Sequence, residues 1–394
     1  MLIVFLIVFI DLVGFGIIIP LLPFVAQHYE ASALEVTLLM AVYSLAQFIA
    51  APYWGRLSDR IGRRPVLLIS LGGLMLTYIW LGFAASLAAL FAARIVGGFM
   101  AGNIATAFAY VADITTRENR AKGMGMIGAA FGLGFMIGPA IGGILAGSDP
   151  ATADFQTPAF VAAGFSAGAL IAGFFLLKES LSPEIRARVA GQSARSRFKD
   201  LLEALRSPSV RRPLLLVFLA TFVFAGLEAT FAIWARYTFE WGPEQTGYLF
   251  AFLGFLSALV QGGMIGKLTK MFGEVRLVVV GSVLLAAGLS SAPWTPGPMS
   301  AVAALGMAGF GFSLLSPSLS SLVSLGASED VQGGVLGASR SAATLGRVAG
   351  PAFSGVMYQF FNPDAPFIAG GFVMVVVAVL AFGLISPNTA AHRS

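Results

Sequence analysis

Cysteine is absent from this chain of 394 residues, and histidine occurs only twice, as His28 and His392. These absences exclude disulfides, thiolate catalysis and any metal site built from cysteines or from several histidines. Charge is also scarce, since only 11% of the residues are Asp, Glu, Lys or Arg, whereas about 25% is usual in soluble domains. A surface with so few charges is poorly solvated, which excludes a soluble multidomain enzyme.

Long apolar runs take the place of the missing charges, and 57% of the residues are hydrophobic. A helix needs about 20 residues to cross about 30 Å of hydrocarbon. The runs are long, continuous and not alternating, so they predict helices rather than the strands of a barrel. The expected fold is an all-α polytopic membrane protein with twelve transmembrane helices. The expected spans are 2–27, 34–57, 66–85, 87–112, 121–147, 158–178, 211–237, 244–268, 275–293, 298–325, 331–358 and 365–386.

Segment 179–210 interrupts the apolar pattern. It is rich in arginine, while Phe198, Leu201, Leu202 and Leu205 recur at helical spacing. This spacing predicts a cytoplasmic connector that contains a short amphipathic helix on the membrane surface. A disordered basic linker is the alternative.

Positive charge is unevenly distributed among the loops. If the N-terminus is cytoplasmic, the inner loops are 55–64, 117–122, the connector and 266–276, and they hold most of the lysines and arginines. This asymmetry predicts an inner-membrane protein with both termini in the cytoplasm. It also accounts for the net charge of +5 without a nucleic-acid partner.

Two sequence patterns recur at nearly the same offset. Residues 55–62 (GRLSDRIG) match residues 266–273 (GKLTKMFG) in degenerate form, and Gly138-Pro139-Ala140 recurs as Gly350-Pro351-Ala352. The repeat predicts two homologous halves of six helices in the same orientation. The expected organisation is an N-terminal bundle over 1–178, the connector over 179–210 and a C-terminal bundle over 211–394. Two such pseudo-symmetric bundles with a site between them form the architecture of an alternating-access carrier.

Several motifs resemble those of the major facilitator superfamily, and the resemblance extends over essentially the whole chain. Residues 55–64 (GRLSDRIGRR) resemble its highly specific loop motif, and residues 94–98 (RIVGG) are similar to its motif in span four. Residues 134–143 (GFMIGPAIGG) resemble the span-five signature of drug/proton antiporters. Residues 11–20 (DLVGFGIIIP) resemble the first span of the tetracycline/proton antiporters.

The resemblance implies a monomeric carrier that needs no cofactor. Its partners would be a small amphipathic organic substrate, protons and the lipid bilayer. The second half departs from the bacterial tetracycline exporters at residues 226–230 (GLEAT) and at Arg340 and Arg347. This pattern looks closer to animal tetracycline-transporter-like proteins, which are associated with organic anions.

The loop motif supplies candidate gating residues. Gly55 is expected to let span two approach a neighbouring helix closely. Asp59 and Asp113 are expected to pair with Arg63 or Arg64, and the pairs would staple the two halves together when the carrier faces outward. The alternative is that the arginines only determine topology, although a topology signal needs no aspartates.

Span five supplies two further gating candidates, Gly138 and Pro139. Small residues at four-residue spacing let helix backbones meet, and proline bends a helix. Tight packing of this span would seal one access path. Generic packing without a gating role is the alternative, and the gating interpretation requires the same close contacts.

Ionisable residues within the spans indicate function, because a charge at a helix centre costs about 2.5–3.5 kcal/mol on insertion scales. Asp11 and Glu228 are the proton-coupling candidates, since burial favours the neutral carboxyl and a nearby arginine favours the charged one. A fixed ion pair or a position at the end of a span is the alternative. Arg94 is the third proton-coupling candidate, with a structural ion pair as its alternative.

Arg340 is a substrate-binding candidate that offers a cation to an anionic group. Alternatively, it neutralises an acidic residue, for which Glu228 is the first candidate. Arg347 is seven residues away on the same helix face and is expected to be structural.

Uncharged polar and aromatic residues at mid-span depth complete the candidate substrate site. Such a mixture suits an amphipathic ligand, although most aromatics in a membrane protein face lipid or a neighbouring helix. The candidates are Gln47, Asn103, Gln261, Phe15, Tyr43, Phe231 and Trp234.

Together these patterns predict a secondary active transporter that exports amphipathic organic compounds or drugs by proton antiport with alternating access. No GxxxxGK[ST] motif supports nucleotide hydrolysis, and protons fit the carboxyls better than sodium does. The first rival is an organic-anion or lipid-like amphipath transporter that works by uniport or symport. A membrane enzyme would need a nucleophile–base pair or a metal cluster, and a scaffold has little use for charges within the membrane.

Overall fold

The computed structural model describes residues 2–116, 120–181, 208–327 and 332–384. Within these ranges the chain forms helices joined by short turns, and no strand occurs among them. The twelve expected spans correspond to twelve helical stretches whose ends lie within about one turn of the expected boundaries. The amphipathic helix predicted in the connector falls on residues 182–207, outside the described residues.

Eleven of the helical stretches are long and apolar enough to cross a membrane. The twelfth stretch is α16 (Gln332–Phe360), which has 29 residues and is much less apolar than its neighbour α17 (Ala365–Phe382). It contains Arg340, Arg347 and many small residues. The expected all-helical membrane fold is confirmed, and the stretch that is least apolar for its length carries two arginines in its interior.

By their internal contacts, the described residues form two compact units. Unit 1 comprises those of Met1–Ser196 together with Ala229–Phe255, and unit 2 comprises those of Arg197–Glu228 and Leu256–Ser394. These units differ from the bundles expected from the repeat, because residues 229–255 group with the first half. The division at 178 and 211, which rests on the repeat and not on contacts, stays a prediction.

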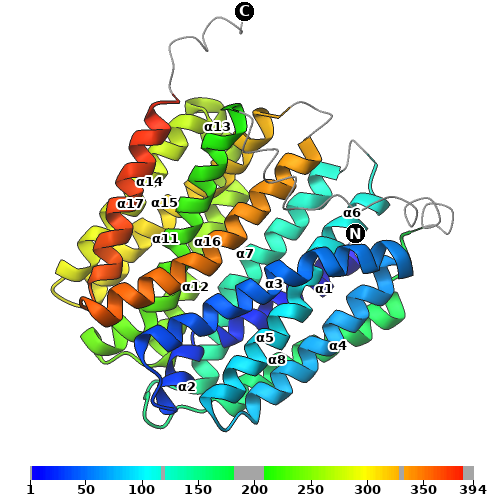
Figure 1. Ribbon diagram of the computed structural model, residues 1–394, viewed down its shortest axis with the longest axis horizontal. Coiled ribbons are helices and arrows are strands. Elements are labelled where there is room, and N and C mark those ends of the chain that lie inside the picture. Colours follow the sequence, from blue (N-terminus) through cyan, green and yellow to red (C-terminus); the bar gives the residue numbers. More distant parts are fainter. Residues whose placement is uncertain (1, 117–119, 182–207, 328–331, 385–394) are drawn as a thin grey trace, which may run out of the picture. The chain divides into compact units, whose positions relative to one another are not determined.

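In unit 1, α1 packs along α7 and α8, and α4 packs along α8 and α5 (Figure 1). Each helix keeps an apolar face against these neighbours, and one buried cluster lies between α1, α4, α6, α7 and α8. The helices are α1 (Leu2–Ile18), α2 (Leu22–His28), α3 (Ala33–Ile61), α4 (Arg63–Gly82), α5 (Leu87–Met100), η1 (Ala101–Asn103), α6 (Ile104–Ile114), α7 (Arg120–Ala146) and α8 (Gln156–Leu176).

In unit 2, α14 packs against both α15 and α17 (Figure 1). Two helices, α11 and α12, contribute residues to both units. The elements are α11 (Pro208–Phe239), α12 (Pro243–Leu259), the π-helical turn η2 (Val260–Met264), α13 (Ile265–Phe272), α14 (Glu274–Ser291), the 3₁₀ turn η3 (Ala292–Trp294) and α15 (Pro298–Leu325), followed by α16 and α17.

The internal repeat is visible in two tight turns. Gly62 ends α3 and begins α4 with φ 108° and ψ 159°, and Gly273 ends α13 and begins α14 with φ 77° and ψ 159°. A positive φ of this kind strongly favours glycine. The two glycines occupy corresponding positions of the repeated loop motif, so the repeat preserves the backbone conformation although most of its charged residues differ.

The span-five glycines pack α7 against α1. A Cβ on Gly138 would lie 2.7 Å from the Gly16 Cα atom and from the Val13 carbonyl oxygen. A Cβ on Gly16 would lie 3.0 Å from the Pro139 ring. One turn further along α7, a Cβ on Gly142 would collide with the Ile17 carbonyl oxygen. The expected tight packing of span five is therefore confirmed, and its partner is span one.

Replacing Gly142 with alanine should separate α7 from α1, since the added methyl group has no space. Overpacking of this kind costs about 1–3 kcal/mol, so we expect a lower thermal-unfolding temperature of the purified protein in detergent. Gly132→Ala in the same helix is the matched control, because a Cβ there meets nothing within 4 Å. Equal stability of the two variants would show that the close approach is not required.

Candidate functional site

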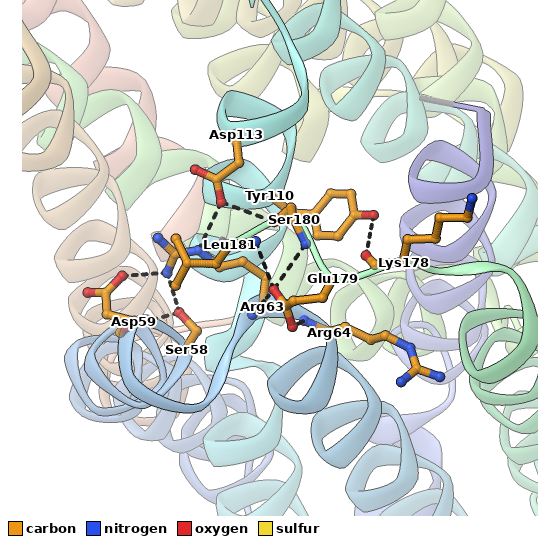
Figure 2. A network of polar contacts seen from close by, with 11 residues as sticks. Ser58, Asp59, Arg63, Arg64, Tyr110, Asp113, Lys178, Glu179, Ser180 and Leu181 are labelled. Atoms are coloured by element: carbon orange, nitrogen blue, oxygen red, sulfur yellow. Dashed lines mark hydrogen bonds and ion pairs between the residues drawn. The ribbon is translucent and has the colours of Figure 1, made fainter. Parts of the chain in front are cut away.

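The turn between α3 and α4 carries a network of polar contacts (Figure 2). We call it the turn network and define it as Ser58, Asp59, Arg63, Asp113, Glu179 and Ser180. Arg63 lies at its centre: Nη1 is 2.5 Å from Asp59 Oδ1, and Nε is 3.2 Å from Asp113 Oδ2. Nη1 also donates to the Ser58 hydroxyl at 2.6 Å. The predicted pairing of both aspartates with Arg63 is confirmed.

Glu179, just after α8, joins the network through backbone groups (Figure 2). Its Oε1 accepts from the Arg63 N–H at 2.9 Å, and its Oε2 accepts from the Arg64 N–H at 3.2 Å. Oε1 also accepts from the N–H groups of Ser180 and Leu181, each at 3.0 Å. A carboxylate at a helix N-terminus satisfies orphan donors and complements the helix dipole. The carboxylate of Glu179 thus holds the start of α4 against the end of α8.

Arg64 makes contacts different from those of Arg63, and Gly55 does not take the place expected for it. Arg64 Nη2 donates to the Phe174 carbonyl oxygen at 2.6 Å, and the guanidinium lies 5.5 Å from the centre of the Phe174 ring. A Cβ on Gly55 would meet nothing within 4 Å, so the expected close helix approach at Gly55 is wrong for this structure. The gating roles of both residues stay predictions.

Arg94 is the buried cation of unit 1. The residue is 4% exposed, and its guanidinium lies 4.0 Å from the centre of the Tyr43 ring and 6.0 Å from that of Phe15. The Phe15 and Tyr43 rings contact each other at 5.1 Å. Among the described ion pairs none includes Arg94, and a desolvated cation–π contact contributes about 2 kcal/mol. Phe15 and Tyr43, both predicted to bind substrate, therefore hold Arg94. They replace the structural ion pair considered for it from the sequence.

Asp11 lies in α1 close to the same group. Its Oδ1 atom is buried and has no hydrogen-bond partner among the described residues. Tyr43 and Tyr78 are close enough to both Asp11 and Arg94 to sense the charge of each. Asp11 and Asn103 line one small cavity of about 20 Å³. The structure thus gathers Asp11, Arg94, Phe15, Tyr43 and Asn103 in one region.

Span four is broken at this depth by the 3₁₀ turn η1. Three consecutive carbonyl oxygens at the break accept bonds from side chains of α3 and α4. Trp54 Nε1 donates to Phe99 at 2.6 Å, the Ser70 hydroxyl to Met100 at 2.7 Å, and Gln47 Nε2 to Ala101 at 3.1 Å. In hydrocarbon a freed carbonyl has no water to bind, so these side chains stabilise the break. Gln47, predicted to bind substrate, has this structural contact.

In unit 2, Glu228 pairs with Arg347. Arg347 Nη1 lies 3.6 Å from Glu228 Oε2, and the side chains are 39% and 13% exposed. The distance is long and the arginine is half-exposed, so the pair contributes little to stability. This geometry fits the structural role expected for Arg347 and leaves Glu228 able to change its partner.

Arg340 lines a separate cavity of about 130 Å³ in unit 2. Hydroxyl groups dominate its polar wall, and Phe312 with several aliphatic residues forms the rest. The hydroxyl-bearing residues are Thr221, Ser316, Ser320 and Ser339. A cation beside several hydroxyl donors is suited to binding a carboxylate or sulfonate.

The other predicted substrate residues do not line either of the two cavities described above. Gln261 is exposed within the π-helical turn η2 and donates to the Ser257 hydroxyl at 2.7 Å. Phe231 and Trp234 are each 1% exposed, and Phe231 also packs against Trp241 and Phe250. Contact of these two aromatics with a substrate stays a prediction and requires that cluster to open.

Sequence reasoning missed Glu179, Ser70 and Trp54 as site residues. Glu179 falls at the edge of the connector, where a single carboxylate among basic residues carries no signal of its partner. Ser70 and Trp54 lie inside apolar spans, and only the break in span four gives them carbonyls to bind. A polar side chain in each of two neighbouring spans is a weak signal that could have indicated such a break.

The family model that matches the chain is described as Major Facilitator Superfamily, and the match covers residues 4–351. Multidrug resistance protein 2 of Bacillus subtilis (strain 168) is 31% identical over 375 residues, covering 94% of this chain and 91% of that protein. Tetracycline resistance protein, class C, of Escherichia coli is 32% identical over 362 residues, covering 88% of this chain and 87% of that protein.

Solved structures are similar as well. The crystal structure of the human organic anion transporter MFSD10 (TETRAN) superimposes with a TM-score of 0.73 at 29% identity, covering 96% of this chain and 98% of that one. A bacterial homologue of the human lysosomal transporter Spinster, in an inward-facing and unoccupied conformation, gives a TM-score of 0.75 at 16% identity, covering 97% of this chain and 94% of that one. The second likeness concerns the fold alone.

Replacing Glu179 with alanine removes the acceptor of four backbone N–H groups, two at the start of α4 and two in the segment that follows α8. The side chain is exposed, so we expect a loss of about 1 kcal/mol in the free energy of unfolding. Glu179→Gln keeps one acceptor oxygen and should lose less. Thermal unfolding followed by tryptophan fluorescence measures both.

Lys178→Ala is the control for Glu179, because Lys178 is the adjacent residue and its carbonyl oxygen, which a substitution keeps, accepts from the Tyr110 hydroxyl at 2.7 Å. If Glu179→Ala unfolds at the wild-type temperature while Lys178→Ala does too, the carboxylate does not hold α4.

Proposed function

The chain belongs to the major facilitator superfamily, and we propose that it exports amphipathic organic compounds in exchange for protons. The observation that carries this proposal is the carboxyl of Asp11 inside span one, with a buried oxygen that has no partner among the described residues. A carboxylate in that position is costly, whereas the protonated form is neutral. Such a carboxyl is stable inside the protein when it is protonated, and stable as a carboxylate when it faces water. It is therefore suited to coupling proton movement to transport.

The surroundings of Asp11 support the same function. Arg94 lies in the same region, held by Tyr43 and Phe15 rather than by a carboxylate. A fixed Asp–Arg pair would keep Asp11 charged through the whole cycle, because a close cation favours the carboxylate. Since no such pair occurs among the described residues, Asp11 is able to alternate between its two states as its access to water changes.

The relatives support drug export. One is called a multidrug resistance protein and another a tetracycline resistance protein, and this chain matches most of the length of each. Export of amphipathic compounds against a gradient requires an energy source, and the sequence offers no nucleotide-binding loop. A proton gradient supplies it through Asp11, with Glu228 as the second proton-coupling residue and Arg94 assisting.

The turn network is the proposed gate. Its ion pairs are part-exposed, with side-chain exposures of 11% for Arg63, 33% for Asp59 and 25% for Asp113. Part-exposed pairs contribute about 0–1 kcal/mol each. Pairs of that strength are able to form and break within a transport cycle, whereas a fully buried network would lock one state.

Asp11→Asn should uncouple transport from protons. In proteoliposomes with an imposed pH gradient, we expect gradient-driven transport of ethidium or tetracycline to fall about tenfold or more. Exchange without a gradient should persist, since asparagine mimics the neutral carboxyl. Asp149→Asn, in an exposed loop, is the matched control. Wild-type proton-driven flux in Asp11→Asn would exclude Asp11 as the proton carrier.

A second candidate function is transport of organic anions, and the cavity at Arg340 favours it. The combination of one arginine, four hydroxyl-bearing residues and Phe312 suits an aromatic or apolar molecule that ends in a carboxylate or sulfonate. A related protein, human MFSD10, is described as an organic anion transporter. In this case the anionic group would bind at Arg340 and the apolar part would contact the neighbouring helices.

Arg340→Gln tests the second candidate. If anions are the substrates, we expect transport of fluorescein to fall about tenfold or more, since a hydrogen-bonded charge pair is lost, while transport of ethidium is unchanged. Arg340→Lys keeps the charge and should retain part of the fluorescein flux. Equal loss of both substrates would assign Arg340 a structural role instead.

A further inference from the structure

The break in span four has a second consequence beyond its own stability. Glycines bring α3 so close that Cβ atoms on Gly98 or Gly102 would collide with Tyr43 or contact Trp54. The side chains of Gln47, Trp54 and Ser70 then bind the three carbonyls before and within η1. The last residue of that turn is Asn103, which is 5% exposed. Asn103 is therefore held at a fixed place by contacts from two neighbouring helices.

That place is the wall of the cavity shared with Asp11. The cavity has a volume of about 20 Å³, and Asp11 and Asn103 are its charged and amide-bearing lining residues. The remaining wall is aliphatic, contributed by Ile7, Val8, Leu12, Leu67, Leu71, Ile104, Ala107 and Ile127. A site with polar partners and about 10–15 Å³ of such space is large enough for one water molecule.

A water molecule would also resolve the unpaired carboxyl oxygen. Asp11 Oδ1 is buried without a protein partner among the described residues, and a buried acceptor without a hydrogen bond costs about 1–3 kcal/mol. Water donates to an ionised carboxylate and accepts from a protonated carboxyl. An asparagine amide also offers both a donor and an acceptor, so it holds the water in either state.

Few other titratable groups face Asp11. Asp11 is the only titratable residue of α1, α8 has none, and the described side chains of α7 include none. Tyr43 of α3, Tyr78 of α4 and Arg94 of α5 are within electrostatic range. In α6, Tyr110 binds the Lys178 carbonyl, and Asp113 belongs to the turn network. The cavity that Asp11 lines therefore has one other polar side chain in its wall, that of Asn103.

We propose that this cavity binds one water molecule between the Asp11 carboxyl and the Asn103 side chain, and that Asn103 is a positioning residue for the proton carried by Asp11. The proposal rests on the proposed function, in which Asp11 takes up and releases a proton. It assigns Asn103 to the proton site rather than to the substrate site. The water gives the carboxyl a hydrogen bond in both protonation states.

The test is infrared spectroscopy of the purified full-length protein in liposomes across a pH series. The C=O stretch of protonated Asp11 is identified as the band that disappears in Asp11→Asn. Asn103→Leu keeps the volume but removes both polar atoms, and we expect the pH midpoint of the band to move by about one unit, a tenfold change in proton concentration. Exchange into H₂¹⁸O should shift a water O–H band in the wild type that Asn103→Leu lacks.

Ala107→Val provides a second variant that fills the cavity from one helical turn beyond Asn103 and leaves Asn103 intact. It should move the midpoint in the same way, which also covers a failure of Asn103→Leu to fold. Thr106→Val is the control, since the Thr106 hydroxyl is buried and unpaired among the described residues but does not line the cavity. It should leave the midpoint unchanged.

The outcomes separate the two proposals. If the Asp11 band titrates but both cavity variants keep the wild-type midpoint and water band, the water site is wrong and proton coupling by Asp11 stands. If no band disappears in Asp11→Asn at any pH, Asp11 does not carry the proton, and both proposals fall. A purely structural role of Asn103 would lower stability without moving the midpoint.

Discussion

The lack of water in hydrocarbon is the constraint on which this structure depends. A backbone or side-chain polar group inside a span has little but the protein to bind, and leaving it without a partner costs several kcal/mol. The broken fourth span satisfies this constraint with three side chains from two neighbouring helices, one for each freed carbonyl. These bonds stabilise the break, and the break ends at Asn103, which lines the same cavity as Asp11.

Close backbone approach is the means by which the constraint is met. The glycines of α5, η1 and α7 remove the side chains that would keep neighbouring helices apart. Short distances then let polar groups reach carbonyls across helices, and they increase the dispersion contacts that drive association in lipid. The same packing that stabilises the fold therefore positions the charged residues of the candidate site.

Charged residues follow two different regimes in this protein. At the turn network, part-exposed charges pair directly, and each pair is weak enough to break. Deeper in unit 1, Arg94 is buried and Asp11 has one buried carboxyl oxygen. Neither residue has a direct ion pair among the described residues, and aromatic rings hold the arginine. Weak pairs at the end of the helices and isolated charges within them suit a carrier that moves at its ends and exchanges a proton at its centre.

The sequence alone determined the all-helical membrane fold, the span boundaries and the repeated loop motif, because helix formation in lipid depends on local apolar length and on local turn chemistry. It also identified Asp11, Arg94 and Arg63 as exceptional, since charge is rare within or beside such spans. Only the tertiary structure decided which groups the charged residues contact. Arg94 contacts Tyr43 rather than a carboxylate, Glu228 pairs with Arg347, and Glu179 binds the backbone of α4. These pairings depend on which helices lie side by side and on the depth at which they touch. Residues that pair across helices are far apart in the chain, so no local sequence pattern predicts the pair.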